Sequence, residues 1–225
     1  MKQINLKEMY NAGVHLGSSV KKLNPKMKPY IMCTHDGIAI IDILKTYTRL
    51  FRITLFLKKI IANEGYQVLF VGTQRSIAPL IAEIATKSSS YYINERWKGG
   101  FLTNFKTVKD SRSSRQQDSL EQNQSGFSNE LNSLPDLVII VGQEKELKAI
   151  KECQKLNIPT LTILDSDGDP DKTSLFIPAN DDSQSSVEFI LKHLGQSILI
   201  GRLLYDKKKT KYGFQETSTR DFRKL

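Results

Sequence analysis

Short apolar runs alternate with amphipathic segments from Gly37 onward. The runs are rich in β-branched residues, as buried strands are, and they occupy 37–42, 66–72, 90–94, 136–142 and 159–165. Apolar residues recur at helical spacing in 45–65, 73–87, 143–157 and 185–204. Because parallel strands need a crossover between them, this alternation predicts an α/β fold, a doubly wound parallel sheet in three layers of the flavodoxin-like or Rossmann-like kind.

Two polar segments depart from this alternation. Residues 109–133 are rich in Ser, Gln and Asn with few apolar side chains, so they cannot join a core and form an excursion from the domain. We therefore expect a basic N-terminal arm at 1–36, an α/β domain at 37–204 that carries the excursion, and a basic C-terminal tail at 205–225. We expect both the excursion and the tail to be poorly ordered unless a partner binds them.

Positive charge predominates along the chain. Its 225 residues include 33 Lys and Arg against 24 Asp and Glu, which gives a formal net charge of +9. A polyanion is therefore the leading class of partner. No run reaches the roughly 18 apolar residues of a membrane span, and we expect no membrane partner. Cys33 and Cys153 lack a CxxC companion, which argues against a zinc site or a disulfide.

The segment 13–31, "GVHLGSSVKKLNPKMKPYI", contains four lysines and no acid. Pro25 and Pro29 stiffen the backbone, so its lysines lose less conformational freedom when they bind. This pattern predicts a preorganised phosphate clamp, with a merely solvated loop as the alternative. The four lysines are Lys21, Lys22, Lys26 and Lys28.

The segment 94–109, "NERWKGGFLTNFKTVK", combines cations with aromatic residues. Gly99 and Gly100 allow the backbone to approach a phosphate closely, and Arg96 and Lys98 are candidates to contact it. Trp97 fits a packing anchor as readily as a part of this basic and aromatic surface, and we favour the packing anchor.

Two further basic features are less specific. "VGTQR" (71–75) places Arg75 at a strand-to-helix junction, where free amides favour an anion, but it has neither the Walker pattern nor GxGxxG. The polar face of the helix at 45–65 carries Lys45, Arg49, Arg52 and Lys59, which fit either a solvated face or an RNA contact.

"DSDGDPD" follows directly on the strand at 159–165 and suggests an enzymatic alternative. A calcium loop is not matched, because Gly168 comes one place early and Phe176 occupies the twelfth position. A magnesium-dependent aspartyl phosphotransferase or phosphatase would use Asp165 and Asp167. A turn formed by Asp, Gly and Pro is the simpler interpretation.

Seven motifs occur in the order typical of one family: "AGVHLG", "NPKMKPYI", "LFVGT", "RWKGGFLTNFKTV", "LPDLVIIV", "IPTLTILDSDGDPD" and "IPANDDS". Over residues 6 to 202 the chain resembles the bacterial-type ribosomal protein S2 family. The resemblance implies a doubly wound α/β domain with a protruding helical hairpin. It also implies a structural role in the small ribosomal subunit, bound to small-subunit ribosomal RNA at the solvent-side junction of head and body, beside neighbouring small-subunit ribosomal proteins. Catalysis, cofactor, metal and small-molecule substrate are not expected.

The resemblance and the basic pattern together define the candidate RNA-binding residues: Lys21, Lys22, Asn24, Lys26, Lys28, Arg75, Arg96, Lys98, Gly99, Gly100, Asn104 and Lys106. Two features depart from the family. Ser18 stands where members usually have a second histidine, and the excursion 109–133 is shorter than the family's hairpin. The shortened hairpin and the basic tail suggest an organellar ribosome, mitochondrial by preference, with a plastid or the bacterial cytoplasm as alternatives.

Overall fold

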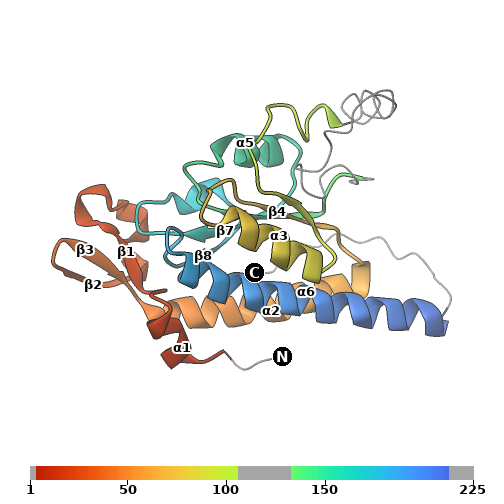
Figure 1. The fold of residues 1–225 in the computed structure, drawn as a ribbon, viewed down its shortest axis with the longest axis horizontal. Coiled ribbons are helices and arrows are strands. Elements are labelled where there is room, and N and C mark those ends of the chain that lie inside the picture. The colour runs from red at the N-terminus through yellow and green to blue at the C-terminus, as the bar shows by residue number, and fades with distance from the viewer. Residues whose placement is uncertain (1–3, 106–132, 213–225) are drawn as a thin grey trace.

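The computed structural model describes residues 4–105 and 133–212 (Figure 1). Its centre is a five-stranded sheet with the order β5-β4-β6-β7-β8, in which every neighbouring pair is parallel. The strands are β4 (Val68–Val71), β5 (Tyr91–Ile93), β6 (Leu137–Val141), β7 (Thr160–Leu164) and β8 (Leu175–Pro178). The predicted doubly wound α/β fold is confirmed. β8 was missed, because its four residues end in a proline and adjoin a turn-rich segment.

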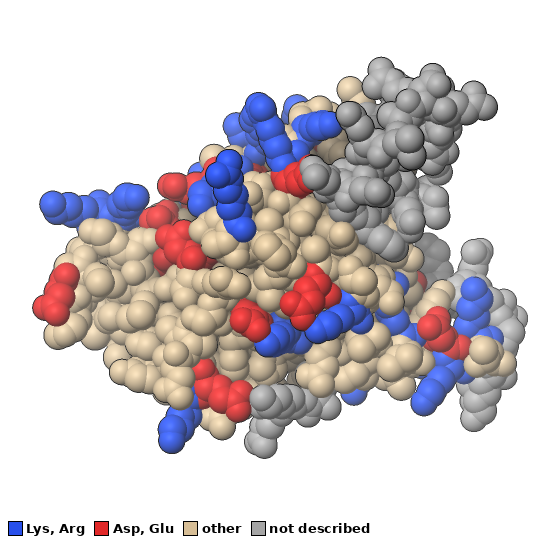
Figure 2. Space-filling model, viewed as in Figure 1, with Lys and Arg blue, Asp and Glu red and all other residues tan. Residues whose placement is uncertain are grey.

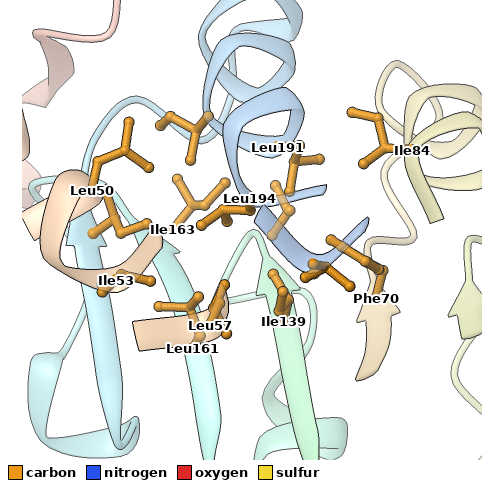
Figure 3. Packing of buried hydrophobic residues seen from close by; sticks show 14 of the residues in the cluster. Leu50, Ile53, Leu57, Phe70, Ile84, Ile139, Leu161, Ile163, Leu191 and Leu194 are labelled. Carbon is orange, nitrogen blue, oxygen red and sulfur yellow. The ribbon is translucent and has the colours of Figure 1, made fainter. Parts of the chain in front are cut away.

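Helices cover both faces of this sheet. The helices that the structure describes are α1 (Leu6–Asn11), α2 (Ile43–Glu64), α3 (Ala78–Lys87), α5 (Leu147–Lys155) and α6 (Gln184–Tyr212). One face packs against α2, α3 and α6, where residues such as Leu57, Phe70 and Leu194 meet in the larger core (Figure 3). The other face packs against α5 and the segment after β5, in a core that includes Trp97 and Ile140. The sheet is therefore the middle of three layers.

Among the helices that the structure describes, α2 and α6 have the most extensive contact with each other (Figure 1). Asp42 caps the start of α2 by accepting hydrogen bonds from the amides of Leu44 and Lys45, and Gly65 ends the helix in the left-handed conformation, at φ 68°. A side chain at Gly65 would collide with Tyr205 of α6. α6 continues to Tyr212, past the predicted end at residue 204. The expected disorder of the tail is therefore wrong for 205–212, and residues 213–225 lie outside the described part of the chain.

The N-terminal part forms a second sheet instead of an arm. β1 (Leu16–Ser19), β2 (Ile31–His35) and β3 (Ile38–Ile41) are antiparallel, in the order β1-β3-β2. The strand predicted at 37–42 is real, but its assignment to the parallel sheet is wrong. Asp36 and Gly37 both have positive φ, 48° and 76°, and close a tight β2–β3 hairpin.

Two short 3-10 helices connect β1 to β2, namely η1 (Val20–Lys22) and η2 (Pro25–Tyr30). Met27 of η2 is fully buried against Leu164 and Phe176, which anchors the lysine-rich segment to the parallel sheet. Of the excursion predicted at 109–133, all but the last residue lies outside the described residues. None of the helices in the described ranges combines the length and hydropathy of a membrane-spanning helix.

Leu57 and Leu55 provide a test of this packing, because they lie two residues apart on α2 and only Leu57 is buried. Leu57→Ala should lower the free energy of unfolding by about 2–5 kcal/mol, because it opens a cavity between α2 and the sheet. Leu55→Ala, the matched control, should change it by less than about 0.5 kcal/mol. Urea denaturation measures both, and equal effects would contradict the assignment of these faces.

Candidate nucleic-acid interface

A buried carboxylate on α5 organises the turn that follows β5. Glu152 Oε1 accepts hydrogen bonds from Trp97 Nε1 at 3.0 Å and from the Gly100 amide at 2.8 Å. Its Oε2 accepts from the amides of Leu102 at 2.9 Å and Thr103 at 3.3 Å. The four donors all lie in one turn, so this single side chain ties the turn to α5 at four points.

Burial and hydrogen bonding act in opposite directions on Glu152. Burial raises the pKa of its carboxyl, whereas the hydrogen bonds from Trp97 and the turn's amides lower it, and the lowering prevails. The carboxyl is therefore ionised at neutral pH, and its charge strengthens the hydrogen bonds that it accepts.

The turn buries its aromatic residues and exposes its cations. Trp97 is buried and packs edge to face against Phe101, with 5.2 Å between ring centroids, which confirms the packing interpretation of Trp97. Arg96 and Lys98 are exposed, and neither forms an ion pair with any residue that the structure describes. Their charges are available to an external anion.

The remaining predicted residues of this segment shape its backbone. Gly100 has φ 84°, a conformation that favours glycine, and its carbonyl accepts a hydrogen bond from the Asn104 amide at 2.9 Å. Gly99 is exposed, with open space where a side chain would be. Lys106 lies outside the described residues.

The lysine-rich segment is fastened to the loop after β7. The Asn24 amide donates to the Ser166 carbonyl at 2.9 Å, and the Asn24 side chain caps η2 by accepting from the Lys26 amide at 3.0 Å. Lys26 Nζ lies 3.0 Å from Asp169 Oδ1 and 2.5 Å from Asp171 Oδ2. The hydrogen bonds from Lys26 to these two carboxylates raise its pKa. Lys26 thus serves the fold, and its charge is largely compensated.

The other three lysines of this segment behave differently from Lys26. Lys21, Lys22 and Lys28 are exposed and pair with no acid among residues 4–105 and 133–212. Both prolines lie within η2, so the stiffness expected from the sequence is present. Figure 2 shows Lys and Arg side chains projecting along the upper edge of the molecule, the edge at which Figure 1 places α5.

The junction after β4 does not offer a free anion site. The Thr73 amide donates to Glu146 Oε1 at 2.8 Å, so a carboxylate of this chain already occupies the position. Burial raises the pKa of Glu146. α3 begins only at Ala78, and Arg75 is exposed before it. The structure thus brings Arg75 to the surface without a prepared phosphate cradle.

Asp165 joins the two sheets. Its Oδ2 accepts from the Ser18 hydroxyl at 2.9 Å, and its Oδ1 accepts from the Ser18 amide at 3.1 Å and the Ser166 amide at 2.5 Å. Burial raises the pKa of Asp165, opposed by these hydrogen bonds. A side chain at Gly17 would come within 2.7 Å of the Ala39 carbonyl, so the close approach of β1 requires glycine. These contacts give Asp165 a structural role, which argues against its use as a nucleophile.

A crevice of about 240 Å³ lies beyond the carboxyl ends of β4, β6, β7 and β8, lined by residues that include Lys22, Gln74 and Asp167. The strand order reverses between β4 and β6, and open α/β sheets often bind ligands at such a point. Carboxylate oxygens of Asp165, Asp181 and Asp182 lie within 4.8 Å of one another nearby, close enough to share a cation. Exposed cations on the loops of an α/β domain indicate a protein that binds a polyanion.

Comparison with known proteins identifies the family. The model of ribosomal protein S2 matches residues 9–127 and 109–201. The small ribosomal subunit protein uS2c of Ostreococcus tauri is 44% identical over 215 residues, covering 84% of this chain and 92% of that protein. The small ribosomal subunit protein uS2c of Chlorella vulgaris is 39% identical over 228 residues, which cover 90% of this chain and 85% of that protein. The small ribosomal subunit protein uS2 of Synechococcus sp. (strain JA-2-3B'a(2-13)) is 37% identical over 227 residues, again with 90% of this chain and 85% of that protein covered. The chain belongs to the ribosomal protein S2 family.

Sequence reasoning missed Glu152, although one signal was available. Ala149, Ile150 and Cys153 define the buried face of α5, and Glu152 falls on the same face. An acid on the apolar face of an amphipathic helix needs donors, and the two glycines of "WKGGF" offer a backbone that can turn toward one.

Glu152→Gln should loosen the turn, because the amide retains one acceptor oxygen and loses the charge. We expect the free energy of unfolding to fall by about 1–3 kcal/mol at neutral pH. Hydrogen exchange should become faster at the amides of Gly100, Leu102 and Thr103. Since the folded-state pKa of Glu152 is lowered, its contribution is present above the unfolded pKa. The difference between variant and wild type should therefore shrink as pH falls through the lowered pKa.

Glu95→Gln is the matched control, because Glu95 is exposed in the same segment. Hydrogen exchange followed by mass spectrometry or NMR distinguishes the variants. Unchanged protection of the three amides in Glu152→Gln would show that the carboxylate does not hold the turn.

Proposed function

We propose that this protein is a structural constituent of the small ribosomal subunit that binds small-subunit ribosomal RNA and supports translation. The observation that carries the proposal is its membership of the ribosomal protein S2 family, whose similar members are named small ribosomal subunit proteins. The expected position, at the solvent-side junction of head and body among neighbouring ribosomal proteins, is part of the same proposal.

The geometry supports RNA binding through two preorganised segments. The Glu152 turn displays Arg96 and Lys98, and the η1–η2 segment displays Lys21, Lys22 and Lys28. Both backbones are fixed by contacts to the parallel sheet or its helices, so little ordering cost remains when a phosphate is bound. Cations of this kind contact the RNA backbone and do not read base edges, as suits a protein that recognises folded RNA by shape.

A non-enzymatic role agrees with the hydrogen bonds that Asp165 accepts within the chain. The phosphotransferase alternative requires a nucleophilic Asp165, and that carboxylate already accepts hydrogen bonds from Ser18 and Ser166. The comparisons give that alternative no support, since the relatives are ribosomal proteins.

The relatives named above are chloroplast and cyanobacterial proteins, so we propose a plastid or bacterial ribosome as the location. The mitochondrial location expected from the shortened excursion has no support among them.

Lysine substitutions in the η1–η2 segment test the RNA contact. One variant replaces Lys21, Lys22 and Lys28 with Ala. The slope of the logarithm of the RNA-binding constant against the logarithm of the salt concentration should become less steep by roughly 0.7–0.9 for each phosphate that is no longer neutralised. Lys26→Ala should leave the slope nearly unchanged, because Asp169 and Asp171 already compensate its charge. Filter binding to small-subunit ribosomal RNA at several salt concentrations measures the slope.

Lys87→Ala is the control, since Lys87 is exposed on α3 and paired with Glu83. Incorporation into small subunits should fall in the triple variant and persist in the control. A triple variant that matches wild type in both measurements would exclude this segment from the interface.

A further inference from the structure

The solvent face of α2 combines positive charge with exposed apolar side chains. From residue 43 to residue 63 the helix contains no Asp or Glu, and it carries five cations. One of them, Arg49, turns inward: its guanidinium lies 4.0 Å from the centroid of the Phe176 ring, and its NH2 donates to the Tyr30 hydroxyl at 2.6 Å. The basic face expected at 45–65 is therefore narrower than the sequence suggests.

Large apolar side chains lie on this face. Leu44 is 59% exposed, Phe51 44% and Leu55 45%. Spacings of seven and four residues place them on one stripe, opposite the buried stripe that contains Leu50 and Leu57. Single exposed apolar residues are common, whereas three in one row on a helix mark a surface to be covered.

A row of cations runs beside the apolar stripe. Lys45, Arg52 and Lys59 follow one another at intervals of seven residues, so they lie along one edge of the stripe. Lys45 contacts the Pro29 carbonyl and Asp42. Arg52 and Lys59 are exposed and have no ion-pair partner in the described ranges. An apolar seam with like charges along its edge is the pattern by which a helix selects a partner helix.

We propose that this face of α2 binds an acidic amphipathic helix of another protein. Leucines of the partner at three- and four-residue spacing would cover Leu44, Phe51 and Leu55, and its flanking Glu residues would meet Arg52 and Lys59. RNA fits less well, because phosphates would leave the apolar stripe in water. A second copy of this chain fits less well too, since it would oppose like charges.

The test uses the full-length protein and two synthetic helical peptides with leucine at a and d, one with Glu and one with Lys at the flanking e and g positions. The acidic peptide should bind wild type saturably in fluorescence anisotropy, and the basic peptide should not. Phe51→Ser with Leu55→Ser should weaken binding about tenfold or more, as removal of a central apolar anchor does. Arg52→Glu with Lys59→Glu should abolish binding of the acidic peptide and allow binding of the basic one.

Leu203→Ser is the matched control, because Leu203 is 53% exposed on α6. Circular dichroism confirms that each variant is folded. Three results would overturn the proposal. The first is binding of the acidic peptide that the double Ser variant leaves unchanged. The second is binding of poly(U) RNA that the double Glu variant abolishes and the double Ser variant does not, and the third is a wild-type dimer in sedimentation that the double Ser variant dissociates. The second result would assign the face to RNA, and the third to another copy of this chain.

Discussion

The parallel sheet must be covered on both faces, and this constraint decides where every other feature lies. The side chains of β4 and β6 point alternately into two cores, so α2, α3 and α6 occupy one face while α5 and the Trp97 turn occupy the other. The contacts to a partner are left to the loops, to the small antiparallel sheet and to the outer faces of helices. The basic segments occur in these places and are rigid because they also pack against the sheet.

In a basic protein, several acids serve mainly as acceptors for the backbone. Glu152 fixes the turn after β5, Asp165 joins β1 to the loop after β7, and Glu146 meets the Thr73 amide. Each is buried next to N–H donors, so its carboxyl group faces inward while lysines remain outside. The exterior of such a protein is more positive than its net charge alone suggests.

The sequence was sufficient for the features that depend on periodicity and insufficient for those that depend on long-range hydrogen bonds. The strands β4, β5, β6 and β7 and the helix that ends at Gly65 follow from local pattern, and they are present. The hairpin at Asp36-Gly37 had a recognisable turn dipeptide, but the alternation around it favoured the parallel sheet. No local pattern shows that Lys26 pairs with Asp169 or that Glu152 meets Gly100, because these partners lie far apart along the chain. The acidic turn at 165–171 and the lysine segment were therefore interpreted separately, although they form one unit.

The end of α6 extends beyond the body. Tyr205 packs at Gly65, where α2 ends, and the helix then continues to Tyr212 with Lys207, Lys208 and Lys209 exposed. At about 1.5 Å of rise per residue, the helix axis runs roughly 10 Å past that contact, and Lys207 to Lys209 lie about 3–6 Å along this extension. Charge on a helix end of this kind attracts an anionic surface at long range. The overhang therefore matters for the rate and orientation of encounter more than for the strength of the final complex.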